Sequence, residues 1–140
     1  MTNQTIQKAC IYGAGAIGGW LGAGLAAAGC SVSVVARGAT LEALHRHGLR
    51  VQKTIRIEPV KVQTTSAAVQ ASADPAALGV QDLVVIAVKA PALLDVARHI
   101  APLIGPDTIV LTAMNGVPWW FLQGFGGALE GRQLAAVDPG

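Results

Sequence analysis

The stretch IYGAGAIGGWLGAGLAAAGCSVSVVARG, residues Ile11–Gly38, decides the fold. The chain carries no charged side chain from Ala9 to Ala36, a run longer than the ~20 apolar residues that cross a bilayer. The spacing of its apolar residues is not uniform, however. Short runs rich in β-branched residues flank a helical pattern that is rich in alanine and glycine. We therefore expect a strand, a glycine turn, a helix and a second strand, rather than a membrane span or a signal peptide.

Composition bounds the class of protein. The 140 residues suffice for one domain with a core, and the net charge of +2 comes without a lysine or arginine cluster. We therefore expect no nucleic-acid partner and no membrane association. Cys10 and Cys30 match neither a metal spacing nor a disulfide framework, and no metal site is expected. Two small, buried thiols are typical of a cytoplasmic protein.

Strand and helix patterns alternate along the rest of the chain. The strands are expected at 6–12, 31–36, 82–88 and 108–114, and the helices at 16–28, 40–47 and 91–104, with Thr40 as an N-cap. Alternation at 49–63 indicates one or two half-exposed strands, and Asp74-Pro75 can start a short helix. Apolar runs at 82–88 and 108–114 predict strands buried on both faces. The pattern predicts an α/β fold, a Rossmann-like doubly wound, mostly parallel sheet with helices on both faces.

The glycine turn fits the pattern G-x-G-x-x-G, in which the glycines are Gly13, Gly15 and Gly18. The first glycine permits the tight turn, the second leaves room for a pyrophosphate, and the third lets the helix lie close to the strand. The helix start presents free N–H groups to phosphates. The predicted contact residues are Gly13, Ala14, Gly15, Ala16, Ile17 and Gly18. The alternative is a glycine-rich turn without a ligand.

Arg37 directly follows the second strand, roughly 20 residues beyond the loop, where an acid would bind the ribose hydroxyls of NAD. No acidic residue occurs between the loop and Glu42. A guanidinium suits the 2′-phosphate of NADP through charge and forked donor geometry. The position therefore favours NADP(H) over NAD(H), and the alternative is a solvated loop charge.

Two further polar residues follow buried strands, where ligands of doubly wound sheets lie. Lys89 comes after the strand at 82–88, and Asn115-Gly116 comes after the strand at 108–114. Lys89 can offer a cation and Asn115 can donate and accept hydrogen bonds, so both are candidates for positioning nicotinamide or substrate. The alternatives are a solvent-facing lysine and an ordinary turn.

Other notable residues receive structural interpretations. Asp95 and Arg98 are three apart on a helix and predict an exposed ion pair, and Asp82 predicts a cap or turn residue. The aromatic cluster 119–121 is expected to pack under the sheet edge, against a missing domain or against a second chain. Surface or helix-end positions are expected for His45, His47 and His99.

The glycine stretch, Gly48-Leu49, DLVVIAVKA and MNGVPWW together resemble the N-terminal domain of the ketopantoate reductase (2-dehydropantoate 2-reductase) family, over about Ile6 to Trp120. The resemblance implies an NADPH-dependent oxidoreductase that reduces ketopantoate to pantoate, on the route to pantothenate and coenzyme A. It further implies that residues 13–18 hold the pyrophosphate and that Arg37 holds the 2′-phosphate. Lys89 and Asn115 would lie near cofactor and substrate.

The resemblance also exposes a departure, because family members carry a second, helical domain with the lysine that acts as general acid. We expect an NADP-binding domain at 1–120 and a glycine-rich tail at 121–140, with that helical domain absent. Such a chain would bind NADP(H) and need the rest of the enzyme to act on a small 2-keto acid. We also expect it to form a homodimer. The alternatives are a non-catalytic NADP-binding or redox-sensing module, a reductase of another 2-keto acid, and an oxidoreductase of the 3-hydroxyacid or 6-phosphogluconate type.

Overall fold

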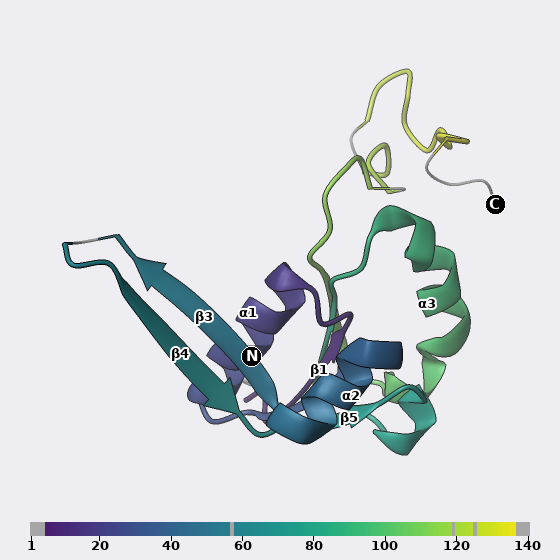
Figure 1. Cartoon of the computed structure of the whole chain (residues 1–140). Helices are drawn as coiled ribbons and strands as arrows, with labels where there is room; N and C mark the ends of the chain where they lie inside the picture. The colour runs from purple at the N-terminus through teal and green to yellow at the C-terminus, as the bar shows by residue number, and fades with distance from the viewer. Residues whose placement is uncertain (1–4, 57, 119, 125, 137–140) are drawn as a thin grey trace.

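A five-stranded parallel sheet forms the centre of the computed structural model, which describes residues 5–56, 58–118, 120–124 and 126–136 (Figure 1). The strands are β1 (Lys8–Tyr12), β2 (Ser31–Val35), β5 (Gln70–Ser72), β6 (Leu83–Ile86) and β7 (Ile109–Thr112). Their order in the sheet is β5-β2-β1-β6-β7, and the order of strands along the chain reverses between β1 and β6. This arrangement confirms the predicted doubly wound α/β class.

Helices cover both faces of this sheet, as the sequence predicts. Side chains alternate along β1, so Ile11 packs in a core with α1 (Ala16–Ala27) and α2 (Gly38–His47). Tyr12, next in the strand, belongs to a second core with Val96 of α3 (Leu93–His99). The carboxyl end of β1 therefore lies between two helical layers, and this end carries the glycine turn.

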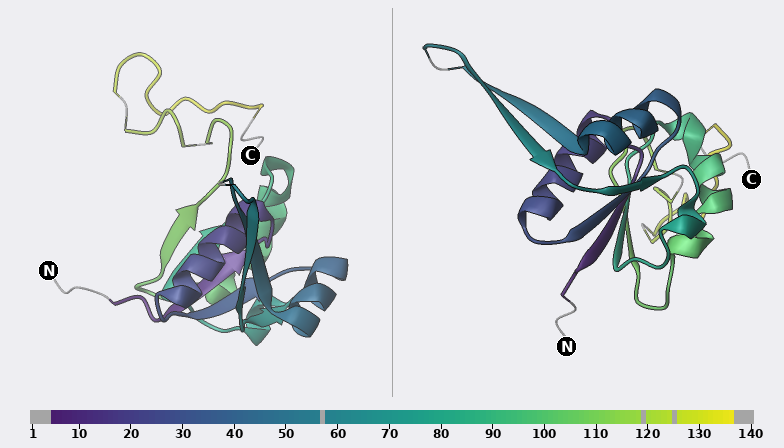
Figure 2. Two further views of the ribbon diagram at one scale, coloured as in Figure 1. Left: turned by 60° about the vertical axis from the view of Figure 1, so that its left-hand side comes forward. Right: turned by 60° about the horizontal axis from the view of Figure 1, so that its bottom comes forward.

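A separate antiparallel hairpin follows α2. It consists of β3 (Leu49–Ile55) and β4 (Lys61–Ala67), in agreement with the alternation at 49–63. The hairpin projects away from the main body (Figure 1 and the right-hand view of Figure 2). Leu49 at its base is buried against α1, which anchors the hairpin to the domain.

The short strand β5 is a feature that the sequence did not predict. It lies in a weakly patterned, alanine- and serine-rich segment and pairs with β2 through three residues. Its formation depends on the neighbouring strand, since its own residues have little preference for a strand. The short helix after it is confirmed: the Asp74 carboxylate accepts a hydrogen bond from the Ala76 amide at 2.9 Å, capping a 3₁₀ turn, η1 (Pro75–Ala77).

The expected long helix at 91–104 is wrong in extent. It consists of η2 (Ala90–Ala92), α3 and η3 (Ala101–Leu103), the first and last being 3₁₀ turns. Pro102 has no amide hydrogen and its ring conflicts with the preceding turn, so the α-helix ends before it. The N-cap of α2 also differs from expectation, because Arg37 rather than Thr40 occupies it.

The expectation that the last strand is buried on both faces is also wrong. β7 pairs with β6 on one side only, and Ile109, Val110 and Leu111 are each about half exposed. A continuous apolar run indicates that a strand is suited to burial on both faces, but the described residues of this chain do not cover both faces of β7. Past β7 the described residues form turns and bends without a helix or strand, and the segment extends away from the sheet (Figure 1 and the left-hand view of Figure 2).

The long uncharged run is divided among three elements, so its length does not correspond to one helix. Across the described ranges, no helix has the length and apolar character needed to cross a membrane. Cys10 is buried in β1, whereas Cys30 is partly buried and donates its thiol to the Ile6 carbonyl oxygen, with Sγ and O 3.4 Å apart.

Candidate dinucleotide-binding site

The glycine loop joins β1 to α1, and Gly13 and Gly18 are packed closely against neighbouring backbone atoms. Gly13 has a φ of +101°, and a Cβ there would lie 2.7 Å from the carbonyl oxygen of Ala87. A Cβ on Gly18 would lie 2.1 Å from the carbonyl oxygen of Gly13. Only glycine satisfies both positions, so the first turn of α1 lies directly against the loop.

Gly15 differs from these two, since a Cβ there would meet no atom of the described structure within 4 Å. It is the N-cap of α1, and its carbonyl oxygen accepts the Gly19 amide at 2.8 Å. The helix begins without an acidic residue in its first turn and without a side-chain cap, so its first amides keep their donor capacity. The loop thus offers an open side next to the first main-chain N–H groups of the helix, which fits a bound diphosphate.

A cavity of about 310 Å³ opens beside this loop. Of the site residues predicted from sequence, it brings together Gly13, Ala14, Gly15 and Arg37. A larger cavity of about 410 Å³, between α2 and the hairpin, contains Ala14 alone of that set. The smaller cavity is therefore the candidate site, because it joins the glycine loop to the end of β2. Its remaining lining residues are Tyr12, Val35, Ala36, Thr40, Val88, Ala92, Asp95 and Val96.

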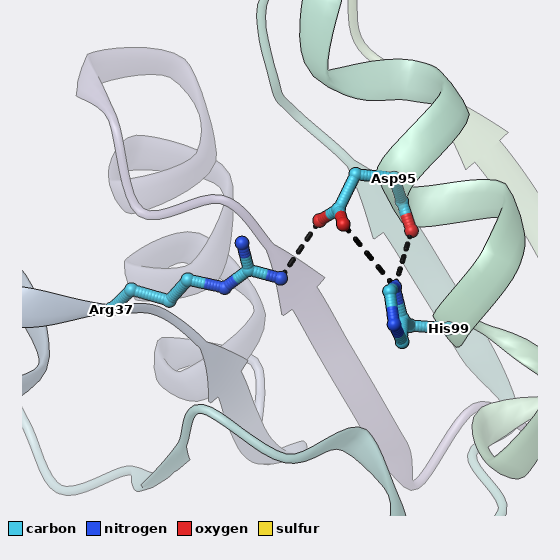
Figure 3. Close-up of polar contacts among 3 residues, drawn as sticks. All are labelled: Arg37, Asp95 and His99. Atoms are coloured by element: carbon cyan, nitrogen blue, oxygen red, sulfur yellow. Dashed lines mark hydrogen bonds and ion pairs between the residues drawn. The ribbon is translucent and has the colours of Figure 1, made fainter.

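An ion pair spans this cavity. Nη2 of Arg37 donates to Oδ2 of Asp95 at 2.7 Å, linking the N-cap of α2 to α3 (Figure 3). His99 contacts the same aspartate, with Nδ1 lying 2.7 Å from its backbone oxygen and 3.4 Å from Oδ1. The predicted pairing of Asp95 with Arg98 is wrong, because the carboxylate points across the end of the sheet toward Arg37.

Tyr12 forms part of the cavity and was missed by sequence reasoning. Its side chain is buried, and its hydroxyl has no hydrogen-bond partner within the described part of the chain. Burial raises the pKa of Tyr12, and the negative charge of Asp95 acts in the same direction. A buried hydroxyl without a partner next to a cavity fits a polar ligand there. The available signal was the alternation along β1, which turns Tyr12 away from Ile11.

Lys89 and Asn115 lie at the same edge of the sheet but outside this cavity. They follow β6 and β7, which are parallel neighbours with Ile86 paired to Thr112. Both residues are exposed, and Gly116 has a φ of +102°. Ile17 is 57% exposed on α1 and, like Ala16 and Gly18, does not line the cavity.

Histidine and acidic residues do not gather into a metal site: within the described ranges, no group of three or more His, Cys, Asp or Glu side chains could hold an ion. His45 bonds the Ala71 carbonyl oxygen at 2.9 Å from the end of α2, a helix-end position. Trp119 lies outside the described residues, while Trp120 and Phe121 are substantially exposed.

The sheet order, with a glycine turn after β1 and helices on both faces, defines a Rossmann-like domain. The chain belongs to the ketopantoate reductase PanE/ApbA family, whose model matches residues 9–118. It is 52% identical over 135 residues to a 2-dehydropantoate 2-reductase of Mesorhizobium japonicum. That match covers 96% of this chain and 39% of the relative, so this chain spans about two fifths of the relative's length.

Solved structures agree with this assignment. A ketopantoate reductase homologue from Ralstonia solanacearum has a TM-score of 0.84 and 54% identity, covering 96% of this chain and 40% of that one. A D-mandelate dehydrogenase solved with NADH and anilino(oxo)acetate has a TM-score of 0.64 and 26% identity, covering 79% of this chain and 34% of that one. The similarity thus extends across almost the whole of this chain.

Proposed function

We propose that this chain is the NADP(H)-binding part of a reductase that converts ketopantoate into pantoate. The observation that carries the proposal is that the glycine loop and the Arg37 guanidinium line one cavity. Main-chain N–H groups at the start of α1 would hold the pyrophosphate, and Arg37 would hold the 2′-phosphate. The buried Tyr12 hydroxyl would gain a hydrogen-bond partner from the same ligand.

The preference for NADP(H) rests on charge. The end of β2 presents a guanidinium where NAD-binding domains present an acid to the ribose hydroxyls. Arg37 is 63% exposed in its side chain, so it can reach a phosphate without breaking a packed core. A charge-assisted contact of this kind contributes about 1.5–3 kcal/mol to binding.

Lys89 and Asn115 are proposed to position the nicotinamide and the keto acid. Each follows the carboxyl end of one of two neighbouring parallel strands, β6 and β7, and ligands of this fold lie at that edge of the sheet. The bound nicotinamide would supply a hydride, and reduction of a ketone also needs a proton donor for the developing alkoxide. We propose that the donor lies in the part of the relatives that this chain does not match, so the chain alone does not turn over substrate.

Calorimetry with NADPH and NADH tests the cofactor proposal. NADPH should bind more tightly, and Arg37→Ala should remove most of the difference. Arg46→Ala is the matched control, since Arg46 is an exposed arginine of α2 paired with Glu42 at 3.1 Å. Equal affinity for the two cofactors in the unmutated chain would discard the role of Arg37, and no heat with either would discard the dinucleotide site.

A reductase of another 2-keto acid is the second candidate. The D-mandelate dehydrogenase neighbour favours it, because that protein was solved with NADH and an oxoacetate derivative. The candidates can be separated by adding the remaining domain of a relative to this chain as a separate polypeptide. Turnover is then compared between ketopantoate and other branched 2-keto acids. Cofactor binding without turnover of any of them would support a non-catalytic NADP-binding or redox-sensing module.

Self-association and a cytoplasmic location complete the proposal. The half-exposed apolar side chains of β7 support self-association through this edge strand. Sedimentation should show a dimer as the concentration rises, whereas a strictly monomeric profile would count against it.

A further inference from the structure

We propose that Asp95 sets the cofactor preference of this site by competing with the 2′-phosphate for Arg37. This inference rests on the proposed NADP(H) binding and deepens it. Asp95 would act through Arg37, as a specificity-determining residue rather than a catalytic one. Removing its charge should therefore strengthen the binding of NADPH and leave that of NADH nearly unchanged.

The geometry shows that the guanidinium is already engaged. Its Nη2 lies 2.7 Å from the Asp95 carboxylate (Figure 3). Arg37 is the N-cap of α2 and Asp95 belongs to α3, and these helices pack in separate cores on opposite faces of the sheet. Both also line the cavity that contains the glycine loop. A phosphate that binds Arg37 in this cavity must either displace the carboxylate or share the guanidinium with it.

The pair is weak enough to exchange. The side chains of Arg37 and Asp95 are 63% and 44% exposed. An ion pair between groups this exposed changes an equilibrium constant by less than about fivefold, and a dianionic phosphate can compete with it. Because both groups would lie in the same cavity, the carboxylate would also repel the phosphate at short range, which weakens the binding of NADPH.

One neighbouring side chain contacts Asp95 in this position. His99, one turn further along α3, contacts both its backbone oxygen and its Oδ1. The buried hydroxyl of Tyr12 lines the same cavity without a partner, which is an independent sign that a polar ligand belongs there. The aspartate thus places a carboxylate at a site otherwise suited to phosphate.

NADH carries no 2′-phosphate, so it does not compete with Asp95 for the Arg37 guanidinium. With NADH the Arg37–Asp95 pair can stay intact, so NADH binding does not carry the cost of breaking it.

The test compares Asp95→Asn with Glu42→Gln by titration of NADPH, NADH and 2′,5′-ADP into the chain. Asparagine keeps the shape and removes the charge. Glu42 is an exposed carboxylate of α2 that pairs with Arg46 and not with Arg37. We expect Asp95→Asn to tighten NADPH and 2′,5′-ADP about three- to tenfold and to change NADH less than about twofold. Glu42→Gln should change each of the three less than about twofold.

The double variant Arg37→Ala, Asp95→Asn tests the route of the effect. If Asp95 acts by occupying Arg37, most of the gain should vanish in the Arg37→Ala background. A gain that persists in full would overturn the competition and assign the effect to direct repulsion. Thermal melting of every variant, which a change in ligand preference alone does not shift, checks that the fold is intact.

The remaining outcomes separate this inference from the proposed function. Failure of the unmutated chain to bind NADPH or 2′,5′-ADP would overturn the proposed function itself. Binding that Asp95→Asn leaves unchanged would overturn the competition alone. Weaker binding of NADPH by Asp95→Asn would also overturn it, since Asp95 would then be holding Arg37 ready for the phosphate.

Discussion

Gly18 and Gly13 approach so closely that a Cβ on Gly18 would lie 2.1 Å from the Gly13 carbonyl oxygen. The same Cβ would lie 3.0 Å from side-chain carbons of Ile11 and Ala87. The helix therefore rests on the loop and on two neighbouring strand ends at once. This contact fixes where the first amides of α1 point, and so it links the packing of the domain to the candidate site.

Gly18→Ala should destabilise the fold, because backbone atoms cannot move aside as the end of a side chain can. Overpacking of this kind costs about 1–3 kcal/mol in the free energy of unfolding, measured by denaturant titration. Gly24→Ala is the control on the same helix, since a Cβ there meets nothing within 4 Å. That control should be neutral or gain about 0.5–1 kcal/mol. Equal stability of the two variants would contradict the close approach.

Gly15→Ala should separate binding from folding. Its new Cβ has no atom within 4 Å and its φ of −74° suits alanine, so the melting temperature should stay near that of the unmutated chain. The methyl group would occupy the open side of the loop, where the pyrophosphate is proposed to lie. We expect NADPH affinity, measured by calorimetry, to fall about tenfold or more, equivalent to about 1.4 kcal/mol. Unchanged affinity would place the diphosphate elsewhere.

Asp82 joins the start of β6 to the start of β1. Its Oδ2 accepts the amides of Gln7 and Lys8 at 2.9 and 2.8 Å, and these hydrogen bonds lower the pKa of Asp82 below its ordinary value of 3.8. A lowered pKa in the folded state stabilises the fold above the ordinary value, and this contribution is lost as pH falls through the lowered one. Asp82→Asn should therefore melt earlier than the unmutated chain at neutral pH.

The difference in melting temperature should shrink as the pH falls from 3.8 toward the lowered pKa of the folded chain, and below that pKa both chains carry an uncharged side chain at this position. The control variant Glu42→Gln should show no such change of its melting difference with pH, since Glu42 pairs with the Arg46 side chain instead of with main-chain amides. A melting difference for Asp82→Asn that is constant from neutral to acidic pH would contradict the role of the carboxylate charge.

The two cysteines should differ in reactivity. Burial raises the pKa of Cys10 to about 12, and its side chain has no exposed surface. Its thiol should therefore resist a disulfide reagent at pH 8, whereas the partly buried Cys30 should react. Native protein should release about one equivalent of reporter thiolate and denatured protein about two. Cys30→Ser should abolish the native reaction, and a fast reaction of that variant would show that β1 opens.

Local sequence was sufficient for the elements whose preferences arise from neighbours in the chain. The glycine turn, α1, β2 and the cap at Asp74 follow from backbone freedom, period and capping chemistry, and the structure has each of them. The break at Pro102 was also present in the sequence and was overlooked. The part of the candidate site formed by the glycine loop and Arg37 was predictable for the same reason.

By itself the sequence determined the alternation of strands and helices, the glycine loop and the cation at the end of β2, because each depends on residues that are close together in the chain. Only the tertiary structure decided that Asp95 pairs with Arg37, 58 residues away, rather than with Arg98. It alone placed the Tyr12 hydroxyl beside that pair and left β7 exposed. The physical reason is that ion pairing and burial depend on which surfaces meet in space, and the spacing of residues along the chain does not contain that information.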